Sequence, residues 1–238
     1  MSSKTLFRLS GLALLLSFPF QIISWFLHPP SHDPVYMLTP HWVPAHVALL
    51  VAWVFVLFGL MGVYARQAHR AGILGLIAFL LTMVGGMGNL YFYFFHAFVT
   101  PGLAKDEATR SLVAPSGVLA EGRSGWLAGL LVLGILLFGI ATVRAGVLPR
   151  WAGLLQIASF PVFMAFLFVP PGVTRTLTAA GIPDFIEIAF LLVFLGYTWA
   201  GYALWTGKGL GQKSRERSVP SQPLAWAQPS EHSPNKRQ

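Results

Sequence analysis

The stretch PAHVALLVAWVFVLFGLMGVYA, residues 44–65, runs for 22 positions without an Asp, Glu, Lys or Arg. A helix needs roughly 20 predominantly apolar residues to cross the hydrocarbon core of a bilayer. Pro44 suits the first turn of a helix, because the N–H that proline lacks would have no partner there. This stretch therefore predicts a transmembrane helix and indicates a helical membrane protein.

Five further stretches have the same character. The first contains Pro19, which we expect to kink it. This stretch also has a basic start, as a signal peptide does. Its apolar run is longer than a signal peptide's 7–15 residues, however, and no small-x-small cleavage site follows, so a retained span is favoured. With residues 44–65 they make about six predicted spans: 6–27, 44–65, 72–99, 125–143, 151–169 and 184–205.

The composition supports the same class. The chain is 55% hydrophobic and 10% charged, with a mean hydropathy of +0.65, whereas soluble domains are about 25% charged. We predict an all-α, polytopic transmembrane bundle in residues 1–206. Residues 207–238 are rich in Gly, Ser, Pro and Gln without a periodic apolar face, which predicts a disordered cytoplasmic tail.

The cationic residues predict an orientation. With the N-terminus inside, four of the 16 Lys and Arg residues fall in outer loops and the other twelve lie inside. This asymmetry follows the positive-inside rule, and it predicts a plasma-membrane protein with both termini cytoplasmic. The pI near 10.2 is then explained by topology and by attraction to anionic lipid. The lipid bilayer is the predicted partner, and no separate motif points to nucleic acid. The four outer cations are Lys105, Arg110, Arg123 and Arg175.

Ionisable residues inside a membrane are costly, so they are the first candidates for a functional site. His46, His96 and Glu187 each fall within roughly 5 Å of the outer end of a predicted span, at 1.5 Å per residue. Two imidazoles and a carboxylate at one depth would suit a transition metal, and two histidines could also ligate haem. His28, His32, Asp33 and His41 belong to the same outer side.

An interpretation without a ligand stays open for these residues. Histidine tolerates the membrane interface, where its ring can reach polar surroundings. Glu187 follows Asp184, and carboxylates favour the positive end of a helix dipole. The three side chains would then share a depth without sharing a site.

Asn89 is the second candidate. It follows Gly85, Gly86 and Gly88 and precedes His96 by seven residues, which places both on nearly the same helix face. A membrane Asn commonly hydrogen-bonds to a neighbouring helix, and that packing role is the favoured interpretation. The alternative is a polar pocket with aromatic walls for a small apolar ligand such as a quinone, lipid or pigment.

One part of the chain resembles a known kind of protein. The segment from Phe138-Gly139 through RAGVLPRWAG, residues 144–153, is similar to an element of small multi-pass bacterial membrane proteins of uncharacterised function. Residues 195–197 and 201–205 resemble the last span of the same group. The resemblance covers the fourth to sixth spans best. It implies a bacterial inner-membrane, multi-pass fold, and it implies no activity and no site residues.

Enzyme signatures are missing from the sequence. It contains no phosphate-binding loop with Gly-Lys-Ser/Thr and no His-Glu-x-x-His. The chain has no Cys, which excludes disulfides, thiolate metal sites and cysteine nucleophiles. The favoured function is a non-enzymatic binding, accessory or transport protein. The alternative is a membrane redox or metal-dependent enzyme with an outer-leaflet site built from His46, His96 and Glu187.

Overall fold

The computed structural model describes residues 2–115, 117–119, 125–169, 173 and 185–207. These residues are helical and contain no strand, so the predicted all-α class is confirmed. The predicted tail from residue 208 onward lies outside the described residues, as does most of the connection at 170–184. The long helices are α1 (Ser3–Leu27), α3 (Trp42–Phe98), α6 (Gly125–Ala145), α7 (Arg150–Phe168) and α9 (Phe185–Thr206).

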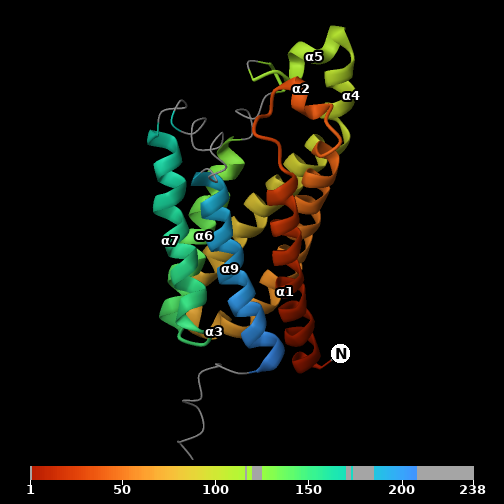
Figure 1. Cartoon of the computed structure of the whole chain (residues 1–238). Helices are drawn as coiled ribbons and strands as arrows, with labels where there is room; N and C mark the ends of the chain where they lie inside the picture. Colours follow the sequence, from red (N-terminus) through yellow and green to blue (C-terminus); the bar gives the residue numbers. More distant parts are fainter. Residues whose placement is uncertain (1, 116, 120–124, 170–172, 174–184, 208–238) are drawn as a thin grey trace, which may run out of the picture.

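The helix α3 is a helical hairpin (Figure 1). Gly72 has φ 59° and ψ −152°, a conformation that interrupts the helix and that costs least at glycine. The arms on either side, 42–71 and 73–98, run antiparallel, because Tyr64 stacks on Phe79 with ring centroids 4.5 Å apart and Trp42 hydrogen-bonds to His96. Residues 66–71, which separate the predicted spans 44–65 and 72–99, are helical, and Gly72 alone makes the turn.

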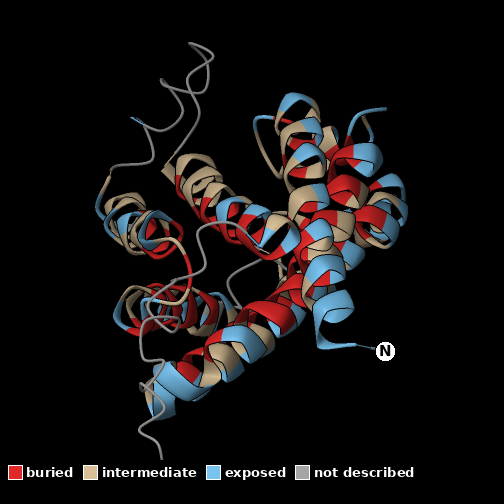
Figure 2. Cartoon of the chain, turned by 90° about the horizontal axis from the view of Figure 1, so that it is seen from below, coloured by how far each residue is buried: buried red, intermediate tan, exposed pale blue. Residues whose placement is uncertain are grey.

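The long helices close into a ring. α3 packs against α1 and α6, α6 against α7, α7 against α9, and α9 against α1. Aromatic side chains fill the interior: the ring centroid of Phe190 lies 6.0 Å from that of Trp53 and 5.2 Å from that of Phe163. Seen along the helices, the buried positions face the interior and the exposed positions face outward (Figure 2).

Glycines allow several of these helices to approach closely. A Cβ atom on Gly11 of α1 would lie 2.6 Å from the carbonyl oxygen of Gly201 in α9, and a Cβ on Gly201 would lie 2.8 Å from that of Gly11. Gly139 of α6 faces Gly153 of α7 in the same way. Small residues at helix interfaces are typical of membrane bundles, where backbone proximity supplies the packing energy.

Three short helices gather at one end of the bundle (Figure 1). They are α2 (Pro34–Met37), α4 (Thr100–Lys105) and α5 (Glu107–Val113). Asp106 separates α4 from α5. Its backbone is extended, and its Oδ1 accepts a hydrogen bond of 3.0 Å from the Ala108 N–H, which caps the start of α5.

Four stretches of the described helices are long and apolar enough to cross a membrane, judged by length and composition: Ser3–Leu27, Trp42–Lys105, Trp126–Ala145 and Phe185–Thr206. The outer surface keeps large apolar side chains exposed, including Phe26 at 84% and Ile73 at 77%. Such a surface fits contact with lipid better than contact with water. The membrane class is therefore consistent with the structure.

Candidate metal centre

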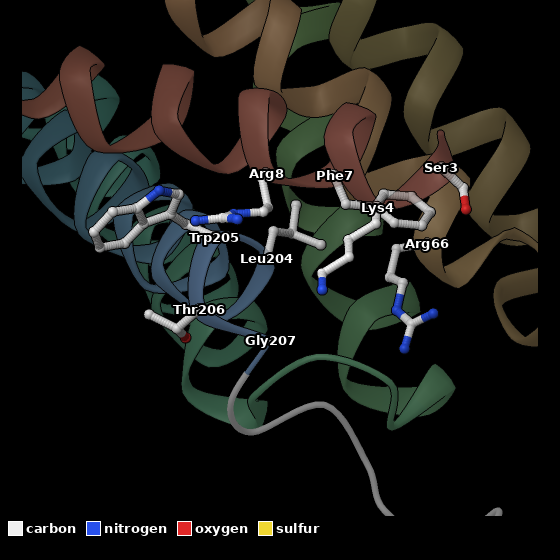
Figure 3. Close-up of a pocket in the computed structure, with 9 residues that line it drawn as sticks. All are labelled: Ser3, Lys4, Phe7, Arg8, Arg66, Leu204, Trp205, Thr206 and Gly207. Atoms are coloured by element: carbon white, nitrogen blue, oxygen red, sulfur yellow. The ribbon is translucent and has the colours of Figure 1, made fainter. Parts of the chain in front are cut away.

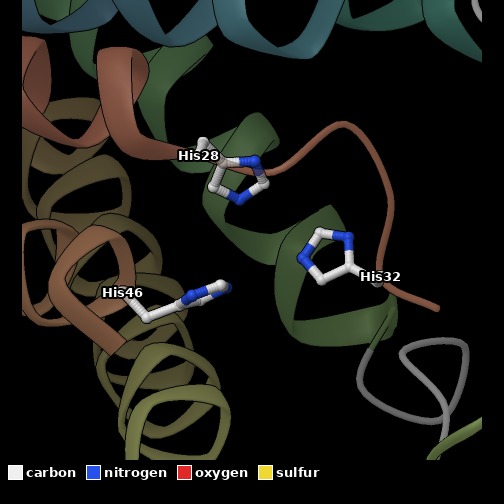
Figure 4. A group of neighbouring side chains, drawn as sticks. All are labelled: His28, His32 and His46. Atoms are coloured by element: carbon white, nitrogen blue, oxygen red, sulfur yellow. The ribbon is translucent and has the colours of Figure 1, made fainter. Parts of the chain in front are cut away.

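Three histidines meet at the end of the bundle that carries the short helices (Figure 4). His28 follows the last residue of α1, His32 lies in the connection to α2, and His46 lies in the first arm of α3. One ring nitrogen from each can be chosen so that all three lie within 4.8 Å of one another. Residues from three separate segments thus present nitrogen atoms to one point.

A fourth imidazole borders this group. The ring centroid of His96, near the end of the second arm of α3, lies 5.2 Å from that of His32 and 5.3 Å from that of His46. The rings of His28 and His46 are also 5.3 Å apart. We call these four residues, His28, His32, His46 and His96, the histidine cluster.

The backbone of α3 fixes the orientation of His46. Its Nδ1 lies 2.8 Å from the carbonyl oxygen of Trp42, one helical turn earlier. Because a carbonyl only accepts hydrogen bonds, Nδ1 must carry the proton, and Nε2 then carries a lone pair. Nε2 is buried and has no hydrogen-bond partner among the described residues. Metal-binding histidines commonly donate their second nitrogen to a carbonyl or carboxylate in this way.

His28 has the same arrangement. Its backbone N–H donates to the Ser24 carbonyl at 2.7 Å and ends α1. Its Nδ1 lies 3.0 Å from the carbonyl oxygen of Pro29. The argument used for His46 assigns the proton to Nδ1 and leaves Nε2 as the nitrogen that can ligate a metal.

His32 is positioned by a tight turn. The Ser31 hydroxyl donates to Asp33 Oδ2 at 2.6 Å, and the Asp33 N–H donates back to Ser31 Oγ at 3.1 Å. Burial lowers the pKa of His32 well below its usual 6.5, and the neighbouring histidines His28, His96 and His46 lower it further. His32 is therefore neutral near pH 7, which is the form that binds a metal.

The aromatic rings of Trp42 and Phe92 pack against the histidine cluster. The Trp42 ring lies 4.2 Å from that of His46 and 5.3 Å from that of His32, and its Nε1 donates to the His96 carbonyl at 2.7 Å. The Phe92 ring lies 4.3 Å from that of His96. Trp42 and His46 are both completely buried. The imidazoles of the cluster therefore lie against apolar, closely packed aromatic side chains.

The spacing is close to what a metal ion requires. Zinc–nitrogen bonds of 2.0–2.1 Å in a tetrahedral site separate ligand atoms by about 3.4 Å. Nitrogens within 4.8 Å of one another reach that separation through shifts of about 1 Å, which small side-chain rotations supply. His28, His32 and His46 can therefore approach one ion without a change in the helices that carry them.

Two of the predicted site residues come together, and two stay untested. His46 and His96 lie side by side in the cluster, with ring centroids 5.3 Å apart; their predicted role as metal ligands stays a prediction. Glu187 is half-buried in the first turn of α9 and is not a member of the three-histidine group, so its part in the site stays a prediction. Asn89 is half-buried, and its Nδ2 has no partner among the described residues; the predicted apolar-ligand pocket beside it also stays a prediction.

The sequence did not identify His28 and His32 as ligands, although it placed them on the same side. Both lie at or beyond the end of α1, where helical periodicity gives no direction for a side chain. The available signal was the concentration of histidines on one side of the predicted membrane. His41 shares that side but is exposed, so the concentration alone does not separate cluster members from the rest.

No protein-family model matches this chain, and neither a curated protein nor a solved structure matches it.

Proposed function

We propose that this chain is a multi-pass membrane protein that binds one first-row transition-metal ion, Zn²⁺ or Cu²⁺, in the histidine cluster. His28, His32 and His46 would supply three ligands and His96 the fourth. The observation that carries the proposal is the convergence of three imidazole nitrogens within 4.8 Å.

The unpartnered nitrogens of the cluster favour a ligand over a purely structural role. Buried polar atoms in native proteins are nearly always hydrogen-bonded, and leaving one unpaired costs roughly 1–3 kcal/mol. Nε2 of His46 and Nδ1 of His96 are both buried without a partner among the described residues. A metal ion bound to these nitrogens would replace the missing hydrogen bonds.

The donor atoms indicate which metal ion the histidine cluster would bind. Imidazole suits Zn, Cu, Fe and Ni, whereas oxygen ligands suit Mg and Ca, and the three-histidine group contains no carboxylate. Haem is less suitable, because a porphyrin must lie between its two axial imidazoles. The rings of His46 and His96 lie 5.3 Å apart and within 20° of parallel, with the His32 ring 5.2–5.8 Å from both. This packing provides no gap for a porphyrin.

The number of ligands favours binding over catalysis. Structural zinc sites are closed by four protein ligands, whereas catalytic sites have three and keep one position open. The ring centroid of His96 lies 5.2 Å from that of His32 and 5.3 Å from that of His46, so a rotation of this fourth imidazole toward the three-histidine group would close the site. We therefore favour a metal-binding, accessory or transport protein over the redox or metal-dependent enzyme with Glu187 in its site.

The membrane arrangement in this proposal has six spans. They are α1, the two arms of α3, α6, α7 and α9, with both termini cytoplasmic and the histidine cluster at the outer end. The distribution of cations supports this orientation. The turn at Gly72 divides α3 into two antiparallel arms, which supports one membrane crossing by each arm. The resemblance in residues 144–153 supports a bacterial inner membrane.

Metal content after purification tests the proposed site. The full chain is purified in mild detergent, stripped with a chelator, reloaded with Zn²⁺ or Cu²⁺ and dialysed to equilibrium. We expect about one ion per chain, and at least tenfold weaker binding in the double variant His28→Ala/His46→Ala. His41→Ala/His69→Ala is the matched control, because both residues are exposed and the same number of imidazoles is removed. Equal binding by the two double variants would contradict the proposal.

A further inference from the structure

A basic pocket lies at the opposite end of the bundle from the histidine cluster. Its volume is about 650 Å³, and it lies between the start of α1, the first arm of α3 and the end of α9 (Figure 3). Three cationic side chains, Lys4, Arg8 and Arg66, line it. The remaining lining residues are Ser3, Phe7, Leu204, Trp205, Thr206 and Gly207.

Among the described residues, no carboxylate lines the pocket. The described acidic residues all lie toward the other end, in or beside α2, α5 and the start of α9. The guanidinium of Arg66 lies 5.6 Å from the centre of the Phe7 ring, a cation–π contact that holds this charge at the pocket wall. The pocket therefore has an excess of positive charge and suits an anion.

The helix ends do not cancel this charge. The N-terminus of α1 contributes roughly +0.5 of a charge and the C-terminus of α9 roughly −0.5. These two contributions offset one another, so the three side chains decide the sign. Arg and Lys both bind phosphate oxygens, Arg through a bidentate pair of N–H donors. A phosphate group is the anion that this set of donors fits best.

The remaining wall is apolar. Phe7 and Leu204 lie beside the cations, and Trp205 is 43% exposed. Tryptophan is enriched where a membrane protein meets the headgroup layer. A ligand with a phosphate and an attached apolar part would satisfy both kinds of wall, whereas inorganic phosphate would contact the cations alone.

We propose that this pocket binds the phosphate headgroup of an anionic phospholipid. Basic pockets between helices on the cytoplasmic side of a membrane are suited to such headgroups. The proposal requires the chain to lie in a membrane with this end inside. It does not depend on the histidine cluster, which lies at the other end.

The alternative is that these cations only set the topology. Arg70, Arg144 and Arg150 provide the comparison, because they belong to the same predicted cytoplasmic side, are exposed and do not line the pocket. The triple variant Lys4→Gln/Arg8→Gln/Arg66→Gln and the control Arg70→Gln/Arg144→Gln/Arg150→Gln each remove three charges from that side.

The test measures binding and thermal stability of the full chain in detergent with added phosphatidylglycerol, phosphatidylcholine or inorganic phosphate. We expect phosphatidylglycerol to raise the melting temperature of the wild type and the control by several degrees, and to bind at least tenfold more weakly to the pocket variant. Equal effects in the two triple variants would overturn the proposal. If phosphatidylcholine stabilised the wild type as much as phosphatidylglycerol does, the pocket would not require an anion. If inorganic phosphate stabilised it as much, the bound phosphate would not need to come from a lipid.

A second measurement does not depend on the folding of any variant. Native mass spectrometry of the wild type, released from an equimolar mixture of phosphatidylglycerol and phosphatidylcholine, should show one phosphatidylglycerol retained in preference to phosphatidylcholine. Retention of both lipids in equal amounts would contradict the proposal. Metal content should be the same in all these variants, so failure here is distinguishable from failure of the metal site.

Discussion

Trp42 contacts three of the four histidines through one indole ring. Its ring lies 4.2 Å from that of His46, 5.3 Å from that of His32 and 5.6 Å from that of His96. Its Nε1 also donates to the His96 carbonyl, which accepts a second hydrogen bond of 2.9 Å from Thr100 Oγ1. Trp42 therefore links the two ends of α3 and fixes the distance between His46 and His96.

The lowered pKa of His32 predicts how the metal-free protein responds to pH. In the unfolded chain the pKa is near 6.5, so below that pH the unfolded state binds a proton that the folded state resists. Stability from this residue is present above about pH 6.5 and is lost as the pH falls. His32→Gln should reduce this slope by up to about 1.4 kcal/mol per pH unit.

Melting temperatures of the metal-free protein between pH 8 and pH 5 measure this slope. His41→Gln is the control, because His41 is exposed and should leave the slope as it is in the wild type. Identical slopes in the wild type and His32→Gln would show that the environment of His32 in the protein differs little from water.

The residues of the site were predictable in part. Helix depth alone placed His46 and His96 in one layer, because each lies near the end of an apolar run whose direction the sequence indicates. The path of the chain from Leu27 to Trp42 was not predictable, since turns such as the Ser31–Asp33 pair carry no periodic signal. His28 and His32 reach the cluster through that path.

At the scale of helices, the hairpin in α3 shows where sequence patterns fall short. Hydropathy predicted two apolar spans and a polar connection between them. The connection at 66–71 continues the helix instead, because Gln67 is buried and its Nε2 donates to Thr142 Oγ1 of α6 at 3.1 Å. A contact with a distant helix thus holds polar residues in helical form, and only Gly72 is needed for the turn.

Helix packing gives a prediction for Gly139. A Cβ atom at this position would lie 2.7 Å from the carbonyl oxygen of Gly153 and 3.0 Å from Cβ of Gln156. Gly139→Ala should therefore push α6 and α7 apart and destabilise the protein by about 1–3 kcal/mol, as overpacking does in a well-packed interior. Unfolding in increasing denaturing detergent measures the change.

Gly129 supplies the control for this experiment. It lies in the same helix, and a Cβ atom there would meet nothing within 4 Å. Gly129→Ala should leave stability unchanged or raise it slightly, because alanine favours helix over glycine. If both substitutions had the same effect, close contact between α6 and α7 would not be what glycine provides at position 139.

At the scale of the whole molecule, the two ends differ in chemistry. One end carries the histidine cluster beside α2, α4 and α5, and the other carries the basic pocket. The sequence predicted this division from the positions of its charges and histidines. It did not predict the ring of helices, because the order of neighbours depends on close contacts such as Gly11 with Gly201, which no local pattern encodes.

The proposed topology is testable with single cysteines. The chain has no Cys of its own, so each introduced thiol reports one position. Val35→Cys and Glu107→Cys should react with a membrane-impermeant maleimide added to intact cells. Thr5→Cys and His69→Cys should react only after the membrane is opened. All four positions are exposed, and the reverse pattern of labelling would contradict the orientation with both termini inside.

The central claim is that imidazoles of the histidine cluster hold a metal ion, and X-ray absorption at the metal edge of the zinc-loaded wild type tests it most directly. Zinc bound in the cluster should show three or four nitrogen neighbours at 2.0–2.1 Å, with the outer-shell scattering of imidazole rings. A first shell of oxygen atoms without imidazole scattering, or a protein that retains no zinc after dialysis, would contradict the claim.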